Sequence, residues 1–163
     1  MNEIDTLMTC AELALALAGF SGIIVVLSRS TAREDSLERL RLTGLLTTAV
    51  GALLLALTPV ALSYLQLEPD TIWRASSALM ATYVAIGLSA LVPRALGDPE
   101  TRARLPLFLV IWGVWGAMAV LQLANATFLP NETRFGVYFA GLAWTLVGGG
   151  IFFCLVLLPP RSS

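Results

Sequence analysis

Residues 9–28 read TCAELALALAGFSGIIVVLS, an apolar run that carries one charged residue, Glu12, near its start. A run of about 20 apolar residues has the length of an α-helix that crosses the hydrocarbon core of a bilayer. The stretch therefore predicts a membrane-spanning helix over residues 7–27. An ionisable side chain inside such a span is expensive, and it is either structurally paired or functional.

The composition of the whole chain supports a membrane location. The chain has 163 residues, of which 57% are hydrophobic and 13% charged, and its mean hydropathy is +0.81. A soluble domain of this size cannot bury so much apolar surface, so lipid is the predicted solvent. Five apolar runs are long enough to span a bilayer: 7–27, 43–65, 72–92, 105–125 and 136–158. The predicted fold is an all-α polytopic membrane helix bundle of five transmembrane helices, formed as a single membrane domain over residues 1–163.

The arginines predict how the chain is threaded. With the N-terminus outside, eight of the ten arginines fall in cytoplasmic segments and only two, Arg74 and Arg134, fall outside. This bias agrees with the positive-inside rule and places the C-terminus in the cytoplasm. The links 28–41 and 93–104 then face inwards, and the links 66–70 and 126–134 face outwards. Small size and the absence of lysine favour a bacterium, so we expect a multi-pass protein of the bacterial inner (plasma) membrane.

The side-chain inventory argues against an enzyme. The chain has no histidine and no lysine, and its two cysteines, Cys10 and Cys154, do not have the spacing of metal ligands. A general acid–base pair, an activated nucleophile or a metal site is therefore hard to build. We predict no catalytic residue, no cofactor-binding residue and no metal-binding residue. No block of basic residues suggests a nucleic acid as a partner.

Four polar residues of the spans are predicted to lie at one level. Glu12 and Arg74 lie a few residues in from the outer ends of their helices, and Gln122 and Asn125 share a face at the outer end of the fourth helix. They form the candidate outer polar cluster. One interpretation is a structural ion pair between Glu12 and Arg74, within a subunit or across a subunit boundary. The other is a filter, gate or proton-coupling site at the mouth of a path.

Small residues at helical spacing predict where the helices pack closely. In lipid, helix association depends on close packing, which small side chains allow. We expect ordinary packing faces within the chain rather than a specific dimer motif. The predicted packing residues are Ala14, Ala18, Gly19, Gly22, Gly113, Gly141 and Gly149.

Three stretches carry a resemblance to other proteins. They are AELALALAGFSGIIVVL, WRASSAL and FGVYFAGLAWTLVGGGIFFCLVLL. Together they resemble a loosely defined group of small bacterial inner-membrane proteins of unassigned function. The resemblance implies that Glu12 and Arg74 form a matched pair, and it implies no activity.

Two function classes remain open. A homo-oligomer that encloses a passive pore for ions or small solutes would use one polar helix face around a symmetry axis. The alternative is a non-catalytic accessory or scaffold subunit of a membrane complex, which needs only packing surfaces. We expect a homo-oligomeric channel, with the lipid bilayer and further copies of the same chain as its partners.

Overall fold

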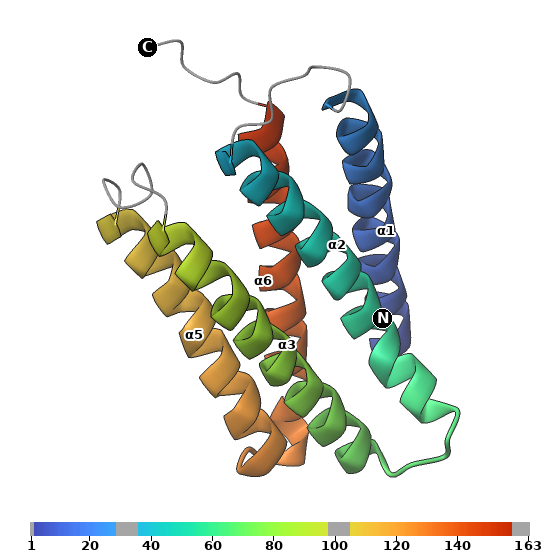
Figure 1. Cartoon of the computed structure of the whole chain (residues 1–163). Coiled ribbons are helices and arrows are strands. Elements are labelled where there is room, and N and C mark those ends of the chain that lie inside the picture. The colour runs from blue at the N-terminus through green and yellow to red at the C-terminus, as the bar shows by residue number, and fades with distance from the viewer. Residues whose placement is uncertain (1, 29–35, 98–104, 158–163) are drawn as a thin grey trace. The chain divides into compact units, whose positions relative to one another are not determined.

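The computed structural model describes residues 2–28, 36–97 and 105–157, and these residues form five α-helices. The helices are α1 (Glu3–Ser28), α2 (Ser36–Ser63), α3 (Pro69–Gly97), α5 (Leu105–Thr127) and α6 (Asn131–Leu157) (Figure 1). Each helix contains a segment long and apolar enough to cross a membrane. The predicted all-helical fold with five membrane-length helices is confirmed, and it indicates a multi-pass membrane protein.

Several helices begin earlier than their apolar runs. Helix α3 begins at Pro69 rather than Ile72, and α6 begins at Asn131 rather than Gly136. Helix α2 begins at Ser36, inside the segment that the apolar pattern assigns to a link. The physical reason is that an apolar run measures the part of a helix that faces lipid, whereas the backbone hydrogen bonds continue into polar turns.

Local signals explain two of these early starts. Pro69 occupies the first turn of α3, where its missing N–H is not needed, and Asp70 places a negative charge beside the positive end of the helix dipole. At the start of α6, the backbone N–H and the Oγ1 hydroxyl of Thr133 both donate to the carbonyl oxygen of Pro130, at 3.1 and 2.9 Å. Glu132 adds an acidic group to that first turn. These contacts bring residues of the predicted links into helices.

Short turns follow helices α2 and α5. Helix α2 ends where Gln66 adopts a left-handed φ of 55°, and the Gln66 N–H donates to the carbonyl oxygen of Ser63 at 3.1 Å. Only residues 128–130 separate α5 from α6. The N–H groups of Phe128 and Leu129 both donate to the carbonyl oxygen of Ala124, at 2.8 and 3.2 Å. The second turn therefore holds the ends of α5 and α6 close together.

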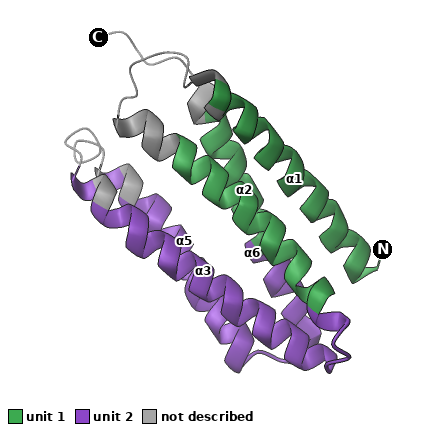
Figure 2. Cartoon of the chain, turned by 45° about the vertical axis from the view of Figure 1, so that its right-hand side comes forward, with its two compact units in different colours: residues 1–61, 142–163 green, residues 62–141 purple. Residues whose placement is uncertain are grey.

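Residue contacts group the chain into two compact units (Figure 2). Unit 1 contains residues 1–61 and 142–163, and unit 2 contains residues 62–141. The apolar pattern, which predicts one membrane domain, does not indicate this division. Helix α6 contributes its second part to unit 1 and its first part to unit 2.

Unit 1 is packed mainly through small side chains. The buried positions of α1 and α2 include Ala14 and the series Ala49, Ala52 and Ala56. Gly44 of α2 lies under a ring of α6, because a methyl group added there would meet Phe152 at 2.9 Å. Such close approach is how helices gain contact area where lipid replaces water.

Unit 2 has a core that is richer in aromatic residues. Helices α3 and α5 lie side by side and run in opposite directions (Figure 1). Trp73 is buried and packs edge-on against Phe135 of α6, with ring centroids 5.3 Å apart, and it also lies 5.8 Å from the ring of Tyr138. Met80 and Tyr138 are fully buried. These contacts fix the start of α3 against the start of α6.

The predicted packing residues have mixed outcomes. Ala14 is fully buried, Ala18 is half-buried, and Gly149 approaches Thr48 and Leu17 closely enough that a methyl group would contact both, at 3.4 and 3.5 Å. Gly141 is more tightly packed still, against Gln122 and Met80. Nothing lies within 4 Å of a side chain added at Gly19, Gly22 or Gly113. Close helix packing at these three positions stays a prediction.

The direction of each crossing stays a prediction that labelling can test. In a chain with Cys10→Ser and Cys154→Ser, the variant Asn131→Cys should react with an impermeant maleimide from outside the cell. The variant Asp98→Cys should react only from the cytoplasmic side, because the distribution of arginine places the two links on opposite sides. Reaction at position 131 from the cytoplasmic side alone would contradict the threading.

Candidate functional site

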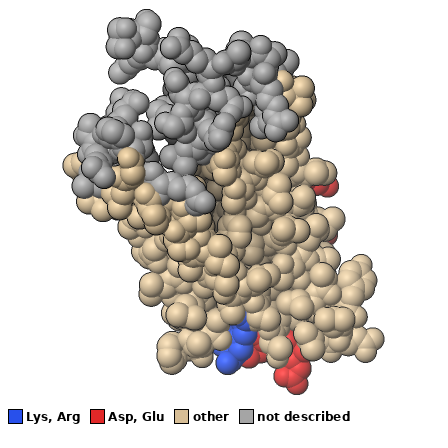
Figure 3. Space-filling model, in the orientation of Figure 1, with Lys and Arg blue, Asp and Glu red and all other residues tan. Residues whose placement is uncertain are grey.

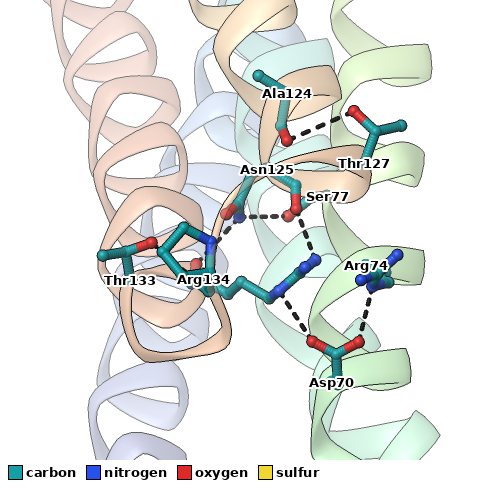
Figure 4. A network of polar contacts seen from close by, with 9 residues as sticks. Asp70, Arg74, Ser77, Ala124, Asn125, Thr127, Thr133 and Arg134 are labelled. Carbon is teal, nitrogen blue, oxygen red and sulfur yellow. Dashed lines mark hydrogen bonds and ion pairs between the residues drawn. The ribbon is translucent and has the colours of Figure 1, made fainter.

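The site is built around Asp70, an acid in the first turn of α3 whose two oxygens contact two different arginines. Its Oδ1 lies 2.9 Å from Nε of Arg134, and its Oδ2 accepts a hydrogen bond of 2.7 Å from Nε of Arg74 (Figure 4). The three side chains differ in exposure: 3% for Arg134, 35% for Asp70 and 47% for Arg74. Asp70 therefore joins a buried cation to one at the surface.

Arg134 occupies a position that helix electrostatics disfavour. It lies in the first turn of α6, where a positive charge meets the positive end of the helix dipole. Two partners of Arg134, one anionic and one dipolar, compensate for this unfavourable interaction with the helix dipole. Besides Asp70, its Nη1 donates to the carbonyl oxygen of Asn125 at 2.7 Å. That carbonyl belongs to the last turn of α5, where backbone acceptors lack a partner within the helix, so Arg134 caps a neighbouring helix.

Asn125 in turn donates hydrogen bonds to α6 and to a third helix, α3. Its Nδ2 donates to the carbonyl oxygen of Arg134 at 3.0 Å and to Oγ of Ser77 at 2.8 Å. Asn125, Ser77 and Arg134 are all buried, so these bonds are made away from lipid. One amide thus connects α5 with the first turn of α6 and with α3 (Figure 4).

Gln122 lies one turn before Asn125 on the same helix and binds α6 in the same way. Its Nε2 donates to the carbonyl oxygen of Val137 at 2.8 Å, and its side chain fills the space above Gly141. Oε1 of Gln122 and Oδ1 of Asn125 are buried and have no hydrogen-bond partner among the described residues. Each side-chain amide is therefore bound through its NH2 group, and its carbonyl oxygen accepts no hydrogen bond from the described residues.

We call Asp70, Arg74, Ser77, Gln122, Asn125 and Arg134 the polar cluster. Its ionised groups are one carboxylate and two guanidinium groups, a net charge of +1. Glu68 and Glu132 are exposed and make no ion pair with these arginines. In Figure 3 the charged surface at the lower end of the view contrasts with the almost uncharged faces of the described helices above it.

The structure brings together only part of the predicted cluster. Gln122, Asn125 and Arg74 all belong to unit 2, and Asn125 and Arg74 join the same network through Arg134 and Asp70. Glu12 belongs to unit 1, is exposed, and forms no ion pair within the described part of the chain. Within unit 2, Asp70 is the carboxylate that binds Arg74. The pairing of Glu12 with Arg74, within a subunit or across a subunit boundary, stays a prediction.

Sequence reasoning missed Asp70, Arg134 and Ser77. Asp70 and Arg134 fall in the predicted links, where the apolar pattern predicts no partner for them. A usable signal was present, because Pro69 followed by an acid is typical of a helix start. Starting the helix there places Asp70 and Arg74 four residues apart on one face, where opposite charges interact.

The contacts of the polar cluster join helices to one another. Both oxygens of Asp70 contact guanidinium groups, and an arginine does not give up its proton in proteins. Among the residues that the structure describes, no group of three or more acids or cysteines is placed to hold a metal ion. The geometry supports the joining of three helix ends and offers no nucleophile beside a base.

Comparison with protein-family models, curated proteins and solved structures finds no match for this chain. The resemblance to small bacterial inner-membrane proteins therefore stays an expectation.

Replacing Asn125 by leucine should lower stability by about 1–2 kcal/mol. The change keeps the number and branching of the side-chain heavy atoms but removes the donor that binds Ser77 and the carbonyl oxygen of Arg134. Single hydrogen bonds between membrane helices contribute up to about 1.7 kcal/mol. Thermal unfolding of the purified protein in detergent measures the loss. Thr127→Val is the matched control, because the Thr127 hydroxyl bonds only to its own helix. Equal midpoints for the two variants would contradict the role given to Asn125.

Proposed function

We propose that the protein is a non-catalytic accessory or scaffold subunit of a membrane assembly. The observation that carries this proposal is the direction of the buried donor groups. Gln122, Asn125 and Arg134 donate to helix carbonyl groups or contact Asp70. Donors used in this way hold helices together, and they are not available to take the place of water around a passing anion.

A passive pore between copies of the chain is the second candidate. The observation that favours it is the exposure of two charged side chains on membrane-length helices, Glu12 on α1 and Arg74 on α3. A symmetric oligomer could turn such charges toward an axis and enclose a path that one chain does not contain.

Reconstitution of the purified protein alone into liposomes separates the two candidates. The scaffold proposal expects ion flux equal to that of empty vesicles prepared at the same lipid ratio. It also expects native mass spectrometry of gently solubilised membranes to find the chain bound to a second polypeptide. Flux well above empty vesicles, together with a change of ion selectivity in Arg74→Gln, would overturn the scaffold and favour the pore. Glu132→Gln is the control, because Glu132 is exposed and contacts none of the polar cluster.

A further inference from the structure

Glu12 is an acid that makes no ion pair with the described residues, and the exposed residues that follow it on its face of α1 are apolar. It is exposed on α1 and lies within the candidate membrane span Glu3–Ile24. Its Cα lies nine residues after Glu3, which is about 14 Å along the helix axis. A single carboxylate at such a depth, facing lipid, is expensive, and such residues pair with another charge in native proteins. Glu12 therefore requires a cation other than the residues that surround it in unit 1.

Arg74 is a cation with capacity for another acid. Only its Nε is bonded to Asp70, and 47% of its side chain is exposed. The polar cluster has one positive charge in excess, so an added carboxylate would neutralise it. Glu12, Arg74, Asp70 and Arg134 would then alternate in sign along one chain of contacts, and each charge would face an opposite one.

Glu12 and Arg74 each stand at one end of a helix face that carries small, exposed residues. Below Glu12 on α1, Ala16, Gly19 and Ile23 recur at helical spacing and are exposed. A shallow apolar groove lined by Gly19, Gly22, Ile23 and Val26 lies on the same helix. Below Arg74 on α3, the exposed residues at helical spacing are small: Ala78, Thr82, Ala85 and Ser89. Small residues on both faces allow two helix backbones to approach closely.

The depths of the two charges are compatible. If each helix crosses the membrane once, α1 and α3 cross in the same direction, because one crossing separates them. The Cα of Arg74 lies five residues after Pro69, about 8 Å along its helix. The difference from Glu12, about 6 Å, is within the reach of a long arginine side chain that extends along an apolar surface.

We propose that Glu12 of one copy of the chain binds Arg74 of a second copy, with α1 of the first packed parallel to α3 of the second. The contact uses two different faces of the same molecule, so each copy offers one of each to its neighbours. A contact of this kind builds a ring when the rotation between copies closes. This contact can form whether or not the assembly conducts ions. Failure of the contact would be seen in cross-linking and in the oligomeric state, whereas failure of the scaffold proposal would be seen as ion flux.

Disulfide cross-linking tests the contact without changing either charge. Two differently tagged chains with Cys10→Ser and Cys154→Ser are co-expressed, one with Ala16→Cys and the other with Thr82→Cys. Both positions lie thirteen residues after the first residue of their helix, so they have the same distance along it, and oxidation in the membrane should give a linked dimer that carries both tags. The control replaces Ala16→Cys with Val26→Cys, which is exposed but lies about 15 Å further along α1 and should give no such dimer.

A second measurement separates pairing between copies from pairing within one chain. Glu12→Gln should shift the purified protein from an oligomer to a monomer in native mass spectrometry, whereas Glu132→Gln should leave the oligomer intact. Cross-linking inside single chains that carry both Ala16→Cys and Thr82→Cys, with no product between tagged copies, would overturn the proposal. An unchanged oligomer in Glu12→Gln would also overturn it.

Discussion

Replacing Asp70 by asparagine should lower the free energy of unfolding by about 3 kcal/mol, near the lower end of the range of about 3–5 kcal/mol for breaking a buried ion pair. The change leaves the Arg134 guanidinium, which is 3% exposed, without its counter-ion. The lower end applies because Asp70 itself is 35% exposed, so water reaches the broken pair. Thermal or denaturant unfolding of purified protein in detergent measures the effect.

The geometry also predicts an order among the variants of this network. Asp70→Asn should be the most harmful, because it affects two arginines at once. Arg134→Met removes the buried charge together with its need for a partner and leaves Asp70 bound to Arg74, so the loss should be smaller. Arg74→Gln should be mildest, since Arg74 is half exposed and surface pairs contribute about 0–1 kcal/mol. Glu132→Gln is the control, and a loss in Asp70→Asn no larger than in this control would contradict the assignment.

Replacing Gly141 by alanine should lower the free energy of unfolding by about 1–3 kcal/mol, the range for an overpacked core. The added methyl group would overlap the amide of Gln122 and would meet Sδ of Met80 at 2.6 Å. Gln122 cannot withdraw without losing its bond to the carbonyl oxygen of Val137. The unfolding midpoint of purified Gly141→Ala, measured in the same detergent as the parent, gives the effect.

Gly136→Ala is a matched control on the same helix. Nothing lies within 4 Å of a side chain added at Gly136, and alanine is a better helix former than glycine by up to about 1 kcal/mol. This variant should therefore be neutral or slightly stabilised. The double variant Gly141→Ala with Gln122→Ala should lose less than the sum of its parts, because the second change removes one of the two collisions. Strict additivity would show that Gly141 and Gln122 do not share this space.

The helices could be predicted from the sequence because the membrane imposes one length and one composition. Five apolar runs of about 20 residues correspond to five helices, and the fourth begins at Leu105 in both. The helix starts near Pro69 and Asn131 could not be obtained in this way. There the backbone continues into charged turns, and hydropathy treats a charged helical residue and a charged loop residue alike.

The candidate site could be predicted in part for the same reason. Gln122 and Asn125 are conspicuous because an amide inside an apolar run requires a partner. Asp70 and Arg134 are charges beside a predicted boundary, where the apolar pattern predicts no partner for them. The sequence therefore favours Glu12, the acid inside a span, as the partner of Arg74, although Asp70 stands one helical turn from Arg74.

The reciprocal contact between Asn125 and Arg134 has a consequence for biosynthesis. The two residues are nine positions apart, so the hairpin of α5 and α6 closes over a very short stretch of chain. Synthesis proceeds from the N-terminus, and by the time Arg134 is added the ribosome has already made both Asn125 and Asp70. The most deeply buried cation of the polar cluster is thus translated after each of the groups that neutralise or solvate it. A chain from which α3 is deleted, with α2 joined directly to α5 and α6, would insert the same arginine without its carboxylate partner Asp70.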